Sequence, residues 1–167
     1  MQFGEIKPSH PGLFAASAPD RPAVTIAESG KRLSYAQFEA ISNQFAHLLR
    51  RAGLARGERV AMLMENHLFY MAFAWGAFRS GLRLVAIATH LSPEEVGYIL
   101  ENTGARLLVT SCALAKTVEC LKMAGVDASR RLVVGGGREG FIDIERVLGT
   151  FPSGPITDQS EGVEVLY

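Results

Sequence analysis

The sequence predicts an α/β fold in which helices flank a mostly parallel sheet, and three observations carry this prediction. Short apolar runs alternate with longer segments of helical periodicity between residues 59 and 134. Glycine or proline separates most of these segments. The 167 residues are 48% hydrophobic, which suits one globular domain with a sizeable core. Strands that alternate with helices of this length favour parallel pairing with right-handed crossovers.

The first third of the chain predicts a hairpin and a long helix after a proline-rich lead. Residues Val24–Glu28 and Lys31–Leu33 have the composition of two short strands around a serine–glycine turn. Ser34 is expected to cap the helix, with Gln37 completing a capping box. Gly53 is expected to end this helix.

Strands and helices alternate through the remainder of the chain. The predicted strands are 59–64, 82–88, 105–110 and 132–134, and the predicted helices are 66–80, 92–104, 112–124 and 142–148. Asn66 and Ser92 are the expected caps of the first two of these helices. Residues 149–162 are expected to form a loop before a final strand marked by Val163, Val165 and Tyr167.

That final strand is followed by no turn and no partner strand. A terminal strand without a partner leaves an edge, which proteins usually pair or cover. We therefore expect residues 1–167 to be the opening part of a longer protein.

Charge and composition exclude several classes of partner. Lysine plus arginine equals aspartate plus glutamate at 17 each, so no nucleic-acid partner is expected. Cys112 and Cys120 fit neither a disulfide framework nor a metal knuckle and are expected to be buried free thiols. The N-terminus lacks the pattern of a signal peptide, and the apolar stretch Leu68–Phe78 is too short for a transmembrane segment. These features predict a cytoplasmic protein.

Gly135, Gly137 and Gly140 match the G-x-G-x-x-G pattern of a dinucleotide-binding turn. That pattern belongs after the first strand of its fold and opens a long helix, whereas here it follows four predicted helices and precedes a short one. We therefore expect a surface turn, with nucleotide binding as the alternative.

Few side chains suggest catalysis or metal binding. His67 and His90 stand at predicted helix ends without a second His, Cys or carboxylate at metal spacing. Glu94 and Glu95 lie in the first turn of a helix, where the helix dipole accounts for them, and Glu101 lies later in the same helix. We assign no catalytic and no metal-binding residue.

The helix containing Leu68–Phe78 is apolar nearly all round. Such a helix is normally interior, so core packing is the expected role. The alternative is an interface with a further domain or with a second subunit in a homodimer.

Several runs in the chain resemble a known family. Arg32–Met64 reads RLSYAQFEAISNQFAHLLRRAGLARGERVAMLM, with a leucine–serine–tyrosine entry, a long helix and a G-E-R-V-A strand. Leu91–Leu100, Gly104–Val109 and Glu164–Tyr167 follow in the same order and spacing. This pattern is similar to the N-terminal part of the acyl-CoA synthetases and fatty-acid–CoA ligases of the adenylate-forming superfamily.

The resemblance implies a partial N-terminal AMP-binding domain over residues 1–167, without the rest of the large domain and the C-terminal domain. In that family a Ser/Thr/Gly-rich loop ending in lysine holds the phosphates of ATP, and here it would begin after Tyr167. Tyr167 is accordingly the one cofactor-binding candidate, as the residue that borders this loop. The parent enzyme would use ATP, Mg²⁺ and coenzyme A to activate a small-molecule carboxylic acid through an acyl-adenylate. The fragment itself would be inactive.

The sequence from Ile87 to Val96 resembles that of CoA ligases that act on fatty acids and on cyclic or aromatic acids. Two other functions remain as alternatives. One is a free-standing α/β binding module that docks a partner through the helix at residues 68–78. The other is a nicotinamide-dependent oxidoreductase using the Gly135 turn, but Asp158 and Glu161 lie in or beside a loop rather than at a strand end.

Overall fold

The computed structural model describes residues 10–119, 126 and 130–165. Among these residues, the largest sheet has six strands in the order β7-β6-β5-β3-β4-β8, and every neighbouring pair is parallel. Its strands are β3 (Arg59–Leu63), β4 (Arg83–Ala86), β5 (Leu108–Ser111), β6 (Arg131–Val134), β7 (Ile142–Asp143) and β8 (Val163–Val165). The predicted α/β fold with a mostly parallel sheet is confirmed.

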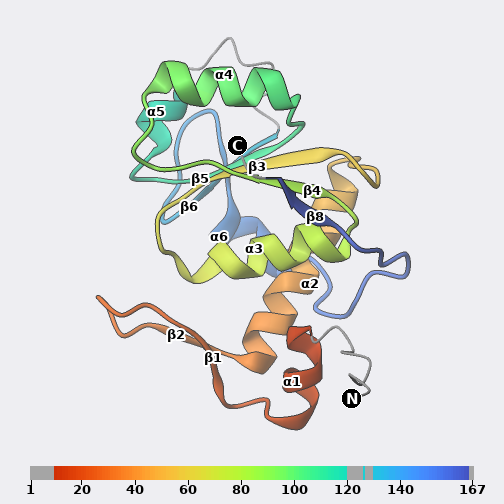
Figure 1. Cartoon of the computed structure of the whole chain (residues 1–167). Coiled ribbons are helices and arrows are strands. Elements are labelled where there is room, and N and C mark those ends of the chain that lie inside the picture. The colour runs from red at the N-terminus through yellow and green to blue at the C-terminus, as the bar shows by residue number, and fades with distance from the viewer. Residues whose placement is uncertain (1–9, 120–125, 127–129, 166–167) are drawn as a thin grey trace, which may run out of the picture.

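The strands β1 (Pro22–Thr25) and β2 (Arg32–Ser34) form the predicted hairpin, which pairs antiparallel in a separate sheet. This hairpin lies below the main sheet in Figure 1, beside the helix α1 (Pro11–Ser17). The sequence analysis missed α1. His10 caps this helix with its ring Nδ1, and Pro11 occupies the first helical position. These two signals are hard to recognise in a segment that contains several prolines.

Helices cover both faces of the main sheet (Figure 1). On one face lie α2 (Tyr35–Arg51), α3 (Leu68–Arg79), α6 (Ile144–Val147) and the short 3₁₀ helix η2 (Leu148–Thr150), and on the other lie α4 (Pro93–Thr103) and α5 (Ala115–Glu119). Val60 and Met62 point into the first core, whereas Ala61 and Leu63 point into the second. The central strand β3 is therefore buried on both faces, as a parallel sheet requires.

Side-chain caps fix the starts of two helices as predicted. Ser34 and Gln37 form a reciprocal capping box at α2, with hydrogen bonds of 2.9 and 3.3 Å. Ser92 and Glu95 form the same arrangement at α4. Gly104 ends α4 in the left-handed conformation, where a glycine has no steric penalty.

The long helices α2 and α3 are joined by a buried ion pair. Arg79 Nη1 and Nη2 each donate to a carboxylate oxygen of Glu39 at 2.8 Å, and Nη1 also donates to Asn43 Oδ1. Burial alone would raise the pKa of Glu39, but the hydrogen bond and charge of Arg79 hold this pKa below its usual range. The pair thus stays ionised between the two helices.

Two of the predicted helices begin later than expected. The predicted helix at 142–148 is split, because the backbone of Ile142 pairs with β6 and the helix begins only at Ile144. The predicted helix at 112–124 begins at Ala115, after a turn in which Ser111 Oγ accepts a hydrogen bond from the Leu114 amide. Its predicted part at 120–124 lies outside the described residues.

The terminal strand is less isolated than expected. β8 pairs with β4 along the register Arg83↔Val163 to Val85↔Val165, so one of its edges is satisfied. Within the described residues its other edge has no partner strand.

Two features that were expected to be buried, the helix containing Leu68–Phe78 and the thiol of Cys112, are only partly buried. Met71 on α3 is 45% exposed, while Trp75 and Phe78 on the same helix are half-buried. The α3 helix is therefore only partly interior, because α2 and the sheet cover one side of it and leave Met71 facing outward. Cys112 is free but half-buried rather than buried, and Cys120 lies outside the described residues.

The close contact between α2 and α3 yields a prediction at Gly76. Alanine is normally favoured over glycine inside a helix by about 1 kcal/mol. A Cβ at Gly76 would lie 2.6 Å from Phe45 Cβ and 3.0 Å from the Ser42 carbonyl oxygen. We expect Gly76→Ala to lower the free energy of unfolding by about 1–3 kcal/mol, measured by urea denaturation.

Gly149→Ala is the matched control, because nothing lies within 4 Å of its added Cβ. This control should be neutral or slightly stabilising. A stabilising Gly76→Ala would show that the two helices are not packed at this distance.

Candidate functional site

The carboxyl ends of the parallel strands meet at one edge of the main sheet. From β3 the chain passes through α3 to β4, on one side of β3, and from β5 it passes through α5 to β6, on the other side. In open α/β sheets, ligands bind at the carboxyl ends of the strands where the connections diverge in this way. The region at the carboxyl ends of β3 and β5 is therefore the candidate site.

Two polar side chains meet in this region. Glu65 follows β3, and Ser111 is the last residue of β5. Ser111 Oγ donates to Glu65 Oε2 at 2.5 Å and accepts from the Leu114 amide at 3.3 Å. Sequence reasoning missed this pair, although both residues stand directly at the ends of predicted neighbouring strands.

His67 lies beside this pair and caps α3. Its Nδ1 accepts a hydrogen bond from the Phe69 amide at 3.2 Å, and the two rings meet edge to face at 5.3 Å. The expected cap, Asn66, is exposed instead. His67 takes this role because its ring packs against Phe69 while its nitrogen reaches the helix end. His67 therefore has a capping role at the start of α3.

Burial lowers the pKa of His67 below its usual range. The negative charges of Glu145 and Glu65 act in the opposite direction, and Lys31 adds to the lowering. The neutral ring is the form that can accept the hydrogen bond from Phe69. The cap and the lowered pKa thus favour the same protonation state.

The glycine turn after β6 is hydrogen-bonded to a side chain of the same chain, Glu145. The Gly135 amide donates to Glu145 Oε1 at 2.8 Å, so a carboxylate occupies the amide that a nucleotide phosphate would need. Gly135, Gly137 and Gly140 are all exposed, and α6 has only four residues. The turn is a surface turn, as expected, and gives no support to the dinucleotide and oxidoreductase alternatives.

The remaining candidates form no site together. His90 is exposed, and so are Glu94, Glu95 and Glu101. Glu95 serves the capping box at α4. Among the residues that the structure describes, no group of three His, Cys, Asp or Glu side chains could hold a metal ion.

The strand β8 runs in the same direction as β4, so its end at Val165 lies at the carboxyl edge as well. Tyr167, the predicted border of a phosphate loop, lies outside the described residues. Its role remains a prediction. A search of the described part of the chain also finds no helix that is long and apolar enough to cross a bilayer.

Comparison with protein families and known proteins gives a consistent result. The family described as "AMP-binding enzyme" matches residues 13–145. The long-chain-fatty-acid–CoA ligase FadD13 of Mycobacterium tuberculosis is 33% identical over 91 residues, covering 54% of this chain and 18% of the relative. The fatty acid–[acyl-carrier-protein] ligase ScoC of Streptomyces coeruleorubidus is 37% identical over 112 residues, covering 67% and 21%. The chain thus spans about a fifth of the length of these curated relatives.

Solved structures share the fold. A Mycobacterium tuberculosis fatty acyl CoA synthetase superposes with a TM-score of 0.80 at 22% identity, over 94% of this chain and 31% of that protein. The anthranilate CoA ligase AuaEII, solved with anthranoyl-AMP, gives a TM-score of 0.76 at 22% identity, over 90% and 30%. The six-stranded arrangement is therefore a fold that this chain shares with these solved structures.

The His67 cap predicts a pH dependence of stability. Because its pKa is lowered in the folded state, the unfolded chain takes up a proton first as pH falls below about 6.5. The free energy of unfolding should therefore be fully present above this pH and decrease below it. His67→Asn, which keeps a good cap without a titrating ring, should flatten this decrease in urea titrations at a series of pH values.

The carboxyl group of Glu39 also has a lowered pKa, but its contribution is lost only below its unfolded pKa of about 4.3. The two effects are thus separable by pH. An unchanged decrease between pH 6.5 and 5 in His67→Asn would contradict the role given to His67.

Proposed function

The chain belongs to the AMP-binding enzyme family, and from this premise we propose that it is part of an ATP-dependent acid–CoA ligase. Such an enzyme joins a carboxylic acid to AMP with release of pyrophosphate, then transfers the acyl group to the thiol of coenzyme A with release of AMP. The observation that carries the proposal is the family match over residues 13–145 together with the fold of solved acyl-CoA synthetases.

The substrate we propose is a fatty acid or a cyclic or aromatic acid. Relatives that support this range are the long-chain-fatty-acid–CoA ligase FadD13, a 3-hydroxybenzoate–CoA ligase and a 4-coumarate–CoA ligase, each matching half of this chain or more. We further propose a cytoplasmic location. A homodimer remains a prediction.

The described residues do not themselves fit ATP, Mg²⁺ or coenzyme A. Two polar contacts at the carboxyl edge are made within the chain itself, Ser111 with Glu65 and the Gly135 amide with Glu145. The described residues also offer no cluster for a metal ion. We therefore derive no catalytic step from them and propose a scaffold role for this chain.

The scaffold role centres on β8. This strand is held in register by β4, and Ser160 forms a parallel bridge with Ser80 just before the strand begins. Its direction carries the chain toward the carboxyl edge, where the resemblance places the phosphate loop after Tyr167. What this chain contributes, on this proposal, is the position and direction of that strand.

Carboxylate-dependent exchange of labelled pyrophosphate into ATP tests the ligase proposal. We expect no exchange by residues 1–167 alone and exchange by the product of the complete reading frame, with a panel of fatty and aromatic acids. Exchange by residues 1–167 alone would contradict the scaffold role. A complete product that shows no exchange with any acid would favour the binding-module alternative.

Gly162 tests whether β8 must sit where it does. A Cβ here would clash with the Leu82 carbonyl oxygen and lie 2.8 Å from Phe78 Cα, both backbone atoms that cannot move aside. Gly162→Ala should lower the free energy of unfolding by about 1–3 kcal/mol and raise hydrogen exchange of the β8 amides.

The matched control is Gly154→Ala in the preceding loop, where nothing lies within 4 Å of the added Cβ. In the complete enzyme, Gly162→Ala should also slow pyrophosphate exchange while Gly154→Ala leaves it unchanged. Normal β8 protection in Gly162→Ala would refute the close approach of β8 to the α3–β4 turn.

A further inference from the structure

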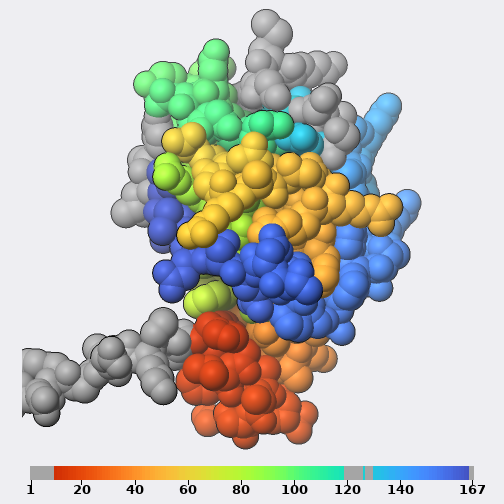
Figure 2. Space-filling view, turned by 90° about the vertical axis from the view of Figure 1, so that its right-hand side faces the viewer, coloured from red at the N-terminus to blue at the C-terminus, as the bar shows by residue number. Residues whose placement is uncertain are grey.

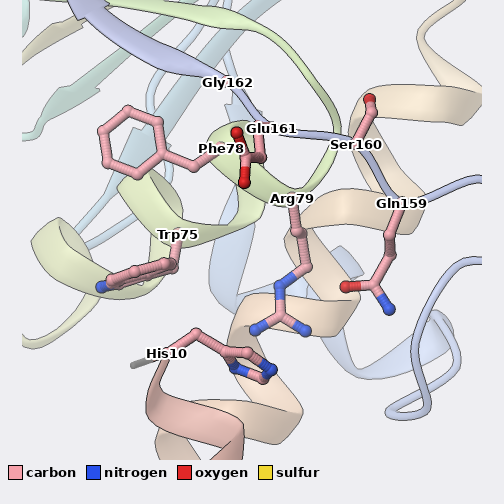
Figure 3. Close-up of a pocket in the computed structure, with 8 residues that line it drawn as sticks. All are labelled: His10, Trp75, Phe78, Arg79, Gln159, Ser160, Glu161 and Gly162. Atoms are coloured by element: carbon pink, nitrogen blue, oxygen red, sulfur yellow. The ribbon is translucent and has the colours of Figure 1, made fainter. Parts of the chain in front are cut away.

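A pocket of about 430 Å³ opens at the edge of the sheet opposite to the candidate site. Figure 3 shows the residues that line it, and Figure 2 shows the segment that leads into β8, in blue, next to α1, in red. Its walls come from the end of α3, the residues just before β8, and His10 at the start of α1. Arg79 precedes β4 and Glu161 precedes β8, which places the pocket at the amino ends of these strands. Its volume lies in the usual range for small-molecule sites.

Arg79 brings a buried, incompletely satisfied donor to this pocket. Its side chain is only 6% exposed, and its two terminal nitrogens donate to Glu39 and Asn43. The donor Nε is buried without a hydrogen-bond partner. A buried donor without an acceptor destabilises a structure, so an acceptor supplied by a ligand would bind favourably here.

Access to this donor requires a small rearrangement. Figure 3 shows the guanidinium of Arg79 between the side chains of Gln159 and His10. Both Gln159 and His10 are exposed, so rotation of the Gln159 side chain costs little. The binding mode proposed below requires that an acceptor atom in the pocket reaches Nε after this rotation.

The charges around the pocket argue against an ionic ligand. Glu39 neutralises Arg79 through two hydrogen bonds, so the guanidinium offers a donor but little net positive charge. Glu161 adds an exposed carboxylate at the rim. An anion would meet this carboxylate. An ammonium cation has no acceptor atom for the Nε–H group. A neutral acceptor meets neither difficulty.

Aromatic side chains form the apolar wall. Trp75 and Phe78 stand edge to face, with ring centroids 5.9 Å apart, and both are half-buried. Figure 3 shows both rings on the same side of the pocket, with Arg79 beside them. A flat apolar body packs well against such a wall.

We propose that this pocket binds a neutral, planar aromatic molecule whose carbonyl oxygen accepts a hydrogen bond from Arg79 Nε. The aromatic body lies against Trp75 and Phe78. The proposal does not depend on the ligase function, because the pocket lies at the opposite edge of the sheet.

Trp75 is the only tryptophan in the chain, so its fluorescence reports directly on the pocket. The probes are benzamide, benzoate and benzylammonium, which share one ring and differ in charge. We expect a saturable change with benzamide, with a dissociation constant of about 1 mM for so small a molecule. The two charged probes should bind at least about tenfold more weakly. Equal or tighter binding of either one, or no saturable change with benzamide, would overturn the proposal.

Arg79→Lys tests the donor, since lysine keeps the charge opposite Glu39 but has no Nε–H group. It should weaken benzamide binding by about tenfold or more. Arg106→Lys is the matched control, because Arg106 also pairs with a glutamate, Glu58, but does not line this pocket. Equal benzamide affinity in Arg79→Lys and Arg106→Lys would overturn the role of Nε.

A second variant covers the case in which Arg79→Lys does not fold. Glu161 is exposed, so Glu161→Gln should preserve the structure while removing the rim charge. It should tighten benzoate binding several-fold and leave benzamide binding unchanged. Unchanged benzoate binding would show that the charges do not select the ligand in the way proposed.

Discussion

Parallel pairing of β3 with both β4 and β5 is the constraint on which the rest of this structure depends. Ala61 pairs with Val85 on one side and with Leu108 on the other. Parallel neighbours require a crossover, and the crossovers place helices on both faces of the sheet. The same constraint collects every strand end at one edge, which is why Glu65 and Ser111 meet although 46 residues separate them.

The ion pair between Arg79 and Glu39 holds together two helices on one face of this sheet. Both charges lie between α2 and α3, and their mutual hydrogen bonds offset part of the cost of burial. Arg79 uses only part of its hydrogen-bonding capacity in this way, because its Nε is buried without a hydrogen-bond partner. A residue whose first role is to fasten two helices thus also presents an unused donor beside a pocket.

Local signals predicted much of this fold from the sequence. Two capping boxes, Ser34 with Gln37 and Ser92 with Glu95, predicted the starts of two helices. This was possible because all residues of a capping box lie within four positions of the sequence. The short β7 strand escaped prediction because Ile142 is extended only through its pairing with β6, which no local signal reveals. The candidate site was harder still. The Glu65–Ser111 contact depends on strand order, and the pocket at Arg79 depends on residues from three distant parts of the chain.

The helix α3 runs from the carboxyl edge of the sheet to its amino edge, so its length is constrained at both ends. Its first turn is capped by His67 at the carboxyl edge, and its last residue, Arg79, reaches the pocket at the amino edge. Twelve residues at about 1.5 Å each give a rod of roughly 18 Å, a distance set by the sheet it crosses. One inserted residue would turn everything after it by about 100° and carry Arg79 away from Glu39. A change in the number of residues in α3 would therefore displace one of its two ends from the groups that it contacts there.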